Sequence, residues 1–284
     1  MRTVRTVADL RAALRGARRA ERSIGLVPTM GALHEGHLSL IRAARADNDV
    51  VVVSLFVNPA QFNEASDLES YPRDEAADTV AAQDAGADLL FAPAVDEVYP
   101  PGFATNVHVA GLTEHLEGER RGAAHFEGVA TVVCKLLNMA QPDTAYFGQK
   151  DAQQAAVIRR MVADLDIPVR ITICPTVREP DGLALSSRNV HLKGEDRRRA
   201  LALRRALDAA DAAVAAGERD SRAIERAGRA AMAELGVDPE YVALVHPDDL
   251  RPVERVDGAV LVAVAARVGT TRLIDNTILH PQKA

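Results

Sequence analysis

The stretch that decides the fold reads Val27-Pro28-Thr29-Met30-Gly31-Ala32-Leu33-His34-Glu35-Gly36-His37-Leu38. It follows a short apolar run over residues 24–27 and leads into the apolar positions Leu38, Leu40 and Ile41. The spacing of these three residues predicts a helix that ends near Ala46. A strand that passes through a glycine-containing loop into a helix is the building unit of α/β proteins.

The same alternation continues toward the C-terminus. Residues 50–57 are almost continuously apolar and β-branched, which is typical of a strand buried on both faces. We expect further helices over 74–85, 129–139 and 151–164, and further strands over 89–91, 145–147 and 169–174. This order predicts a parallel sheet with helices on both faces, whose ligands bind at the carboxyl ends of the strands.

The pattern changes after about Val177. Helical composition extends over 195–216 and 221–234, and strand-like runs follow at 241–245 and 259–266. Helices followed by strands indicate a small α+β domain. We therefore predict two domains, residues 1–176 and 177–284, as the length of 284 residues also suggests.

Composition excludes several classes of function. The chain is 48% hydrophobic and 26% charged, which is typical of a globular protein, and its net charge is −6. A net acidic chain is poorly suited to bind nucleic acid through bulk charge. Aromatic residues amount to only 4%, which argues against base stacking on a single strand. Any phosphate must therefore be held by a local site.

The expected location is the cytoplasm. The N-terminus lacks the apolar core of a signal peptide, and the longest apolar run, residues 259–266, is too short to cross a membrane. Cys134 and Cys174 stand apart in apolar runs, which indicates buried thiols in a reducing compartment.

The run from His34 to His37 carries the strongest chemical signal. A helix start presents unpaired N–H groups and the positive end of a dipole, so it accepts phosphate. Gly36 permits close approach of a ligand, and the two imidazoles project from similar sides of the turn. A metal site is the alternative, but no HExxH pattern or third nearby ligand supports it.

Three other segments are weaker alone. Lys150 could neutralise phosphate charge beside Asp151 and Gln154, although an ordinary capped helix would look the same. Residues 186–188 could form a mobile phosphate clamp, or simply a polar linker. Asn58 and Gln61 could orient a small polar substrate, or stabilise a buried turn.

Taken together, the motifs resemble the pantoate–β-alanine ligase family, within the wider nucleotidyltransferases that share HxGH. The resemblance covers nearly the whole chain, from Pro28 to about Asn276. It rests on PTMGALHEGHLSLI from Pro28, FVNPAQF from Phe56, YPRD from Tyr71, HFEGVATVV from His125, FGQKDAQQ from Phe147, REPDGLALSSRN from Arg178 and GTTRLIDN from Gly269.

The resemblance implies a Rossmann-like N-terminal domain with a smaller α+β C-terminal lid, in a homodimer that uses ATP and Mg²⁺. It implies a reaction in two steps. The carboxylate of pantoate attacks the α-phosphorus of ATP and releases pyrophosphate. The amine of β-alanine then attacks the pantoyl adenylate and releases AMP. The substrates supply both nucleophiles, in keeping with the lack of a Ser/His/Asp or Cys/His arrangement.

The resemblance also implies site residues. His34, His37, Lys150 and Arg188 would stabilise charge at the α-phosphate. The ATP site would comprise Met30, Gly31, Ala32, Leu33, His34, Glu35, Gly36, His37, Gly148, Gln149, Lys150, Asp151, Val177, Leu185, Ser186, Ser187 and Arg188. Pantoate and β-alanine would meet Gln61, Gln154, Asn58 and Tyr71.

Two departures from the family pattern affect the site. Asp78 matches a family position near the metal, but Ala77 and Ala81 replace its acidic neighbours. We therefore expect the Mg²⁺ to be held mainly by phosphates. The run 119–125 has no Pro before His125 and is one residue longer, which leaves Arg121 outside the predicted site.

Two other functions use the same motif. An adenylyl- or cytidylyltransferase would act on a phosphorylated acceptor and make no amide. A regulatory nucleotide-binding module would bind ATP without forming AMP, but it would not need His34, His37 and Lys150 around one phosphate.

Overall fold

The sheet that carries the decisive stretch belongs to the first of two compact units in the computed structural model. The structure describes residues 1–62, 68–69 and 71–281. The first unit comprises Met1–Gly148 and Gln153–Pro175, and the second comprises Gln149–Ala152 and the chain from Thr176 onward.

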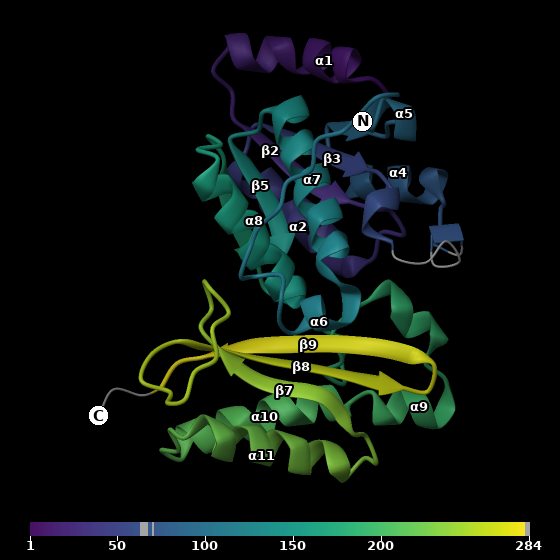
Figure 1. The fold of residues 1–284 in the computed structure, drawn as a ribbon. Coiled ribbons are helices and arrows are strands. Elements are labelled where there is room, and N and C mark those ends of the chain that lie inside the picture. The colour runs from purple at the N-terminus through teal and green to yellow at the C-terminus, as the bar shows by residue number, and fades with distance from the viewer. Residues whose placement is uncertain (63–67, 70, 282–284) are drawn as a thin grey trace. The chain divides into compact units, whose positions relative to one another are not determined.

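Within the described residues, six strands of the first unit form a parallel sheet (Figure 1) in the order β1-β4-β3-β2-β5-β6. The strands are β1 (Arg2–Val4), β2 (Ile24–Thr29), β3 (Val50–Leu55), β4 (Leu89–Phe91), β5 (Thr144–Gly148) and β6 (Arg170–Cys174). The predicted α/β class is thus confirmed. The short edge strand β1 was not predicted, because three residues are too few to show a period.

Helices and short turns connect these strands. They are α1 (Val7–Arg19), α2 (Glu35–Asp47), η1 (Pro59–Gln61), α4 (Glu75–Asp84), α5 (Val95–Val98), α6 (Glu117–Arg121), α7 (Ala123–Ala140) and α8 (Ala152–Asp164). Helix α2 packs against α4, and α1 packs against α7. Right-handed connections place these two pairs on opposite faces of the sheet.

Helix α1 shows how local sequence sets an element. The side chain of Thr6 accepts the N–H of Asp9 and so caps the first turn. Leu10, Leu14 and Ala17 recur at helical spacing and are buried. The helix is therefore amphipathic, with this apolar side against the core.

The direction of chain progression changes between β2 and β5. From β2 the chain moves through β3 to β4, whereas from β5 it moves the other way to β6. The carboxyl ends of these neighbouring parallel strands mark the switch point, where open α/β sheets bind their ligands. The loop over Met30–His34 leaves β2 at this point.

The second unit combines a small sheet with helices. Among the described residues its sheet is antiparallel, in the order β7 (Pro239–Val245), β8 (Val260–Val268) and β9 (Thr271–Leu279). Helices α10 (Ala202–Ala215) and α11 (Ser221–Ala233) pack against it (Figure 1). The turns η2 (Gln149–Asp151) and η3 (Ser187–His191) and helix α9 (Gly194–Arg199) complete this unit.

The prediction of a single helix over 195–216 is wrong, because the chain forms α9 and α10 with a break at Ala200 and Leu201. The N–H of Leu201 bonds to the carbonyl of Arg198, one residue nearer than in an α-helix. Ala200 is completely buried, so packing selects a tight turn where composition favours helix. Strand β9 was also not predicted, since its polar residues interrupt the apolar run.

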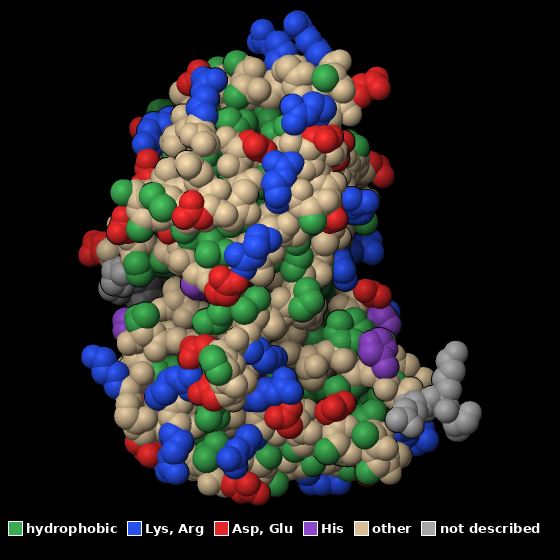
Figure 2. All heavy atoms as spheres, turned by 180° about the vertical axis from the view of Figure 1, so that it is seen from behind, with side chains coloured by type: hydrophobic (Ala, Val, Ile, Leu, Met, Phe, Trp, Pro, Cys, Tyr) green, Lys and Arg blue, Asp and Glu red, His purple; other side chains and the backbone are tan. Residues whose placement is uncertain are grey.

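The surface carries both signs of charge. Lys and Arg side chains are interspersed with Asp and Glu side chains over the face drawn in Figure 2. Among the described residues, no helix combines the length and apolar character needed to cross a membrane. Cys174 is buried as predicted, but Cys134 is only partly buried.

Candidate functional site

The two histidines of the decisive stretch begin helix α2. His34 is the N-cap residue, and its Nδ1 accepts the N–H of Gly36 at 3.1 Å. The Nδ1 of His37 accepts the N–H of His34 at 3.3 Å, which completes a reciprocal capping box. The helix therefore starts at Glu35, three residues before the start suggested by its apolar positions.

The capping box determines how the imidazoles can act. Because each Nδ1 accepts a backbone N–H, the proton of a neutral ring resides on Nε2. The ring centroids of His34 and His37 lie 4.2 Å apart, so the two rings lie side by side at the helix start. Such a pair suits an anionic oxygen.

The loop before His34 is folded around a carboxylate. Asp78 on α4 is 4% exposed, and its Oδ2 and Oδ1 accept the N–H groups of Ala32 and Leu33 at 2.9 and 2.7 Å. These two N–H groups therefore already have a protein partner. The expectation that Ala32 and Leu33 contact ATP thus rests on their remaining atoms.

The acids near Asp78 that the structure describes have partners within the protein. Asp74 caps α4 by accepting the N–H of Ala77, and Glu75 pairs with Arg5. Among the described residues, no group of three His, Cys, Asp or Glu side chains is arranged to hold a metal. The described side chains therefore do not fit an ion held by the protein alone.

A second group of polar residues follows β3. Asn58 is 1% exposed, and its Oδ1 accepts the hydroxyl of Tyr99 at 2.8 Å. Its Nδ2 donates to Oε1 of Gln61 at 3.1 Å and to the carbonyl of Gly128 at 3.0 Å. Asn58 therefore supports Gln61 from within the core, where the sequence suggested direct contact with substrate.

Gln61 is only partly buried and is held from several sides. Its side-chain Nε2 lies 2.8 Å from the sulfur of Met30, and its backbone carbonyl oxygen lies 2.7 Å from Nδ1 of His125. Tyr71, another predicted substrate residue, packs edge-on against Phe62 with ring centroids 5.8 Å apart. Gln61 and Met30 thus link the turn after β3 to the loop after β2.

The two adjacent glutamines of α8 have different environments. Gln153 is buried and binds the carbonyls of Leu112 and His115 at 2.7 and 2.8 Å. Gln154 is partly exposed, as a residue that meets a substrate must be. Arg121 forms an ion pair with the buried Glu117 at 2.9 Å.

Lys150 lies in the second unit, where Asn276 of β9 holds its backbone. The Nδ2 of Asn276 donates to the carbonyls of Gln149 and Lys150 at 3.0 and 2.8 Å, and its Oδ1 accepts Nε2 of Gln149. The ammonium of Lys150 lies 3.6 Å from Asp151, and its side chain is only 18% exposed. Asn276 was not recognised as a positioning residue, although it ends the GTTRLIDN motif.

The predicted clamp residues lie beyond a small hairpin of the second unit. The N–H of Leu185 bonds to the carbonyl of Val177 at 3.0 Å, and Arg178 forms a two-armed ion pair with the buried Asp275. Ser186 caps η3 through the N–H of Arg188. The side chains of Ser187 and Arg188 are partly exposed and exposed, respectively.

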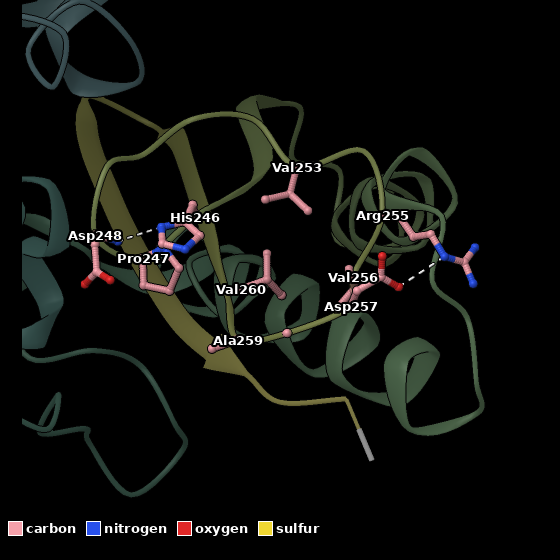
Figure 3. A pocket seen from close by; sticks show the side chains of 10 residues that line it. His246, Pro247, Asp248, Val253, Arg255, Val256, Asp257, Ala259 and Val260 are labelled. Carbon is pink, nitrogen blue, oxygen red and sulfur yellow. Dashed lines mark hydrogen bonds and ion pairs between the residues drawn. The ribbon is translucent and has the colours of Figure 1, made fainter. Parts of the chain in front are cut away.

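A separate cavity of about 270 Å³ in the second unit contains none of the predicted residues (Figure 3). His246, whose Nδ1 accepts the N–H of Asp248, and the Arg255–Asp257 ion pair line it. These polar groups bond to each other, so the cavity offers no converging set of donors for a ligand.

Comparison with known proteins gives consistent results. The family profile described as Pantoate-beta-alanine ligase matches residues 2–278. A pantothenate synthetase of Moorella thermoacetica is 55% identical over 99% of both chains, and one of Roseiflexus castenholzii is 53% identical over 99% of this chain and 100% of its own.

Solved structures agree with these sequence relatives. A pantothenate synthetase from Thermus thermophilus superposes with a TM-score of 0.91 at 50% identity, covering 98% of this chain and 99% of that one. A pantoate–β-alanine ligase from Francisella tularensis, complexed with β-γ ATP and β-alanine, gives 0.79 at 33% identity, covering 99% and 100%.

Proposed function

Because the chain belongs to the pantoate–β-alanine ligase family, we propose that it condenses (R)-pantoate with β-alanine through a pantoyl adenylate. ATP is the co-substrate, and AMP and pyrophosphate are the other products. The observation that carries the proposal is the histidine capping box at the switch point of the parallel sheet.

In the first step a pantoate carboxylate oxygen attacks the α-phosphorus, and the bond to the β-phosphate oxygen breaks. Negative charge grows on the phosphoryl oxygens during this displacement. The Nε2–H groups of His34 and His37 would donate to those oxygens. Stabilisation by such preorganised donors is the main way a protein lowers a barrier of this type.

Lys150 and Arg188 would add positive charge to the same nucleotide, together with the hydroxyls of Ser186 and Ser187. The low exposure of Lys150 supports this role, because a partly desolvated ammonium interacts strongly with phosphate. The backbone bonds from Asn276 limit the positions that Lys150 can adopt.

Gln61 and Gln154 would bind the hydroxyls and carboxylate of pantoate. The bonds that surround Gln61 support this assignment, since a preorganised amide loses little entropy on binding. In the second step the amine of β-alanine attacks the acyl carbonyl and AMP departs. The amine loses a proton as the amide forms.

We further propose that Mg²⁺ accompanies ATP on its phosphates, that two copies of the chain form a homodimer, and that the enzyme works in the cytoplasm. Sedimentation at micromolar concentration tests the dimer. A single species with the mass of one chain would contradict it.

Exchange of labelled pyrophosphate into ATP tests the reaction. The proposal predicts exchange that requires pantoate and does not require β-alanine, and crystals soaked with ATP and pantoate should trap the adenylate. Exchange driven by a phosphorylated acceptor would instead support a nucleotidyltransferase. ATP binding without AMP formation would support a regulatory module.

A further inference from the structure

We propose that Asp78 is a positioning residue that fixes the histidine-bearing loop, and is not a ligand of the metal. Its buried carboxylate uses one oxygen for each of two consecutive backbone N–H groups, those of Ala32 and Leu33. The inference rests on the proposed role of His34 and His37, because Asp78 would act through them.

The backbone of the loop requires such an anchor. Gly31 has φ of +94° and Ala32 has φ of +51°, so two successive residues adopt left-handed conformations. The Cβ of an L-residue such as Ala32 makes that conformation unfavourable. Strained residues of this kind persist only where surrounding contacts fix them. The carboxylate supplies those contacts to the N–H groups that follow Gly31.

The approach of the carboxylate also explains the glycine. A Cβ placed on Gly31 would lie 2.9 Å from Oδ2 of Asp78 and 2.9 Å from Cδ1 of Leu55. These separations are shorter than ordinary van der Waals contacts, so either the carboxylate or the loop would have to move. The absence of a side chain at Gly31 therefore leaves room for the carboxylate of Asp78, which in turn accepts the N–H groups of the next two residues.

The anchored loop leads directly to the histidines. Leu33 precedes the N-cap His34, so the bond from Leu33 to Asp78 sets the direction in which the chain enters α2. At the other end of the loop, the hydroxyl of Thr29 donates to the carbonyl of Ser54 at 2.8 Å. With both ends fixed, the Nδ1 bonds of the capping box can form.

The same geometry argues against a metal at Asp78. A metal at Asp78 would have to use the remaining lone pairs of two oxygens that already accept N–H bonds, in a residue that is only 4% exposed. The neighbouring acids Asp74 and Glu75 are engaged by Ala77 and Arg5. The N–H groups of this turn thus bind the carboxylate of Asp78, as similar turns in other proteins bind a free anion.

The test compares Asp78→Asn, His34→Ala and the double variant in pantoate-dependent pyrophosphate exchange, each over a series of Mg²⁺ concentrations. In the substituted amide an NH₂ group replaces one of the two oxygens, so one of the two backbone N–H groups would face a donor. We therefore expect Asp78→Asn to lower kcat about 100-fold. The Mg²⁺ concentration for half-maximal rate and the pantoate KM should stay within about twofold of wild type.

The double variant should be no more than about threefold slower than His34→Ala alone, because groups that act as one unit are not additive. Asp84→Asn is the matched control: the residue is exposed at the end of the same helix, and the change should leave all parameters unaltered. Rescue of Asp78→Asn by excess Mg²⁺, or fully multiplicative losses, would overturn the inference.

A separate measurement on the wild-type protein covers the case in which Asp78→Asn does not fold. Mn²⁺ added without nucleotide should leave the amide signals of Ala32 and Leu33 unbroadened, whereas broadening that is strongest at these two amides would place the ion at Asp78. If His34→Ala itself exchanges pyrophosphate at the wild-type rate, the proposed site fails. If only Asp78→Asn does so, the site stands and the positioning role fails.

Discussion

Gly128 on helix α7 allows a close contact that can be tested by adding one methyl group. In Gly128→Ala, the new Cβ would lie 2.6 Å from the carbonyl carbon of Ala60 and 2.8 Å from the nitrogen of Gln61. Carbon atoms pack at about 3.5 Å, so the turn η1 must move away from α7 by about 0.9 Å. The obstacle is backbone, which cannot rotate aside as a flexible side chain would.

The magnitude follows from two opposing effects. Overpacking of this kind lowers the free energy of unfolding by about 2–3 kcal/mol. Replacing glycine by alanine inside a helix raises it by about 1 kcal/mol. We therefore expect a net loss of about 1–2 kcal/mol of unfolding free energy. Displacement of Gln61 should also weaken its bond to pantoate and raise the pantoate KM about tenfold, equivalent to about 1.4 kcal/mol.

Urea unfolding and steady-state kinetics measure the two effects. Gly16→Ala in α1 is the matched control, since a Cβ there meets nothing within 4 Å. The control should gain up to about 1 kcal/mol of stability and keep its KM. A Gly128→Ala protein that is as stable as this control, with an unchanged pantoate KM, would refute the reasoning.

Four further changes probe other parts of the molecule. Lys150→Ala should slow adenylate formation by about 100-fold or more while changing ATP affinity far less; an unaltered first step in rapid-quench experiments would contradict its role. Gln154→Ala should raise the pantoate KM, and movement of the β-alanine KM alone would show that the pocket is wrongly assigned. Tyr99→Phe removes the hydroxyl that Asn58 accepts, so the pantoate KM should rise a few-fold with the ATP KM unchanged. Burial raises the pKa of Tyr146 from 10.0 to about 12, so the unfolded chain loses this proton first and stability falls as pH rises from 10 toward 12. In alkaline unfolding, the stability of Tyr146→Phe should fall less steeply with pH than that of the wild type. An identical slope would exclude this contribution.

The fold class and the location of the main motif could be predicted because they depend on local signals. The β-branched strand β3 and the capped helix α1 show their periods within a few residues. Strand β9 lacked such a signal, because Asp275 and Asn276 interrupt its apolar residues. Their burial depends on partners far away in sequence, Arg178 and Lys150.

The roles of individual polar residues were harder to predict than their positions. Asn58 and Gln61 are similar amides in one motif, yet one is buried and the other partly exposed. Asp78 carries a charge that suggested a metal, and in the structure its two oxygens accept the backbone N–H groups of Ala32 and Leu33. Which atoms a side chain meets depends on tertiary packing, and spacing along the chain does not contain that information.

The bonds from Asn276 to the backbone of Gln149 and Lys150 can form only late in the synthesis of the chain. Lys150 leaves the ribosome more than a hundred residues before Asn276, the residue that fixes its backbone. A nascent chain can complete the parallel sheet through β6 while Gln149 and Lys150 still lack this partner. A chain whose synthesis stops anywhere before β9 therefore lacks the side chain that fixes the backbone of Lys150.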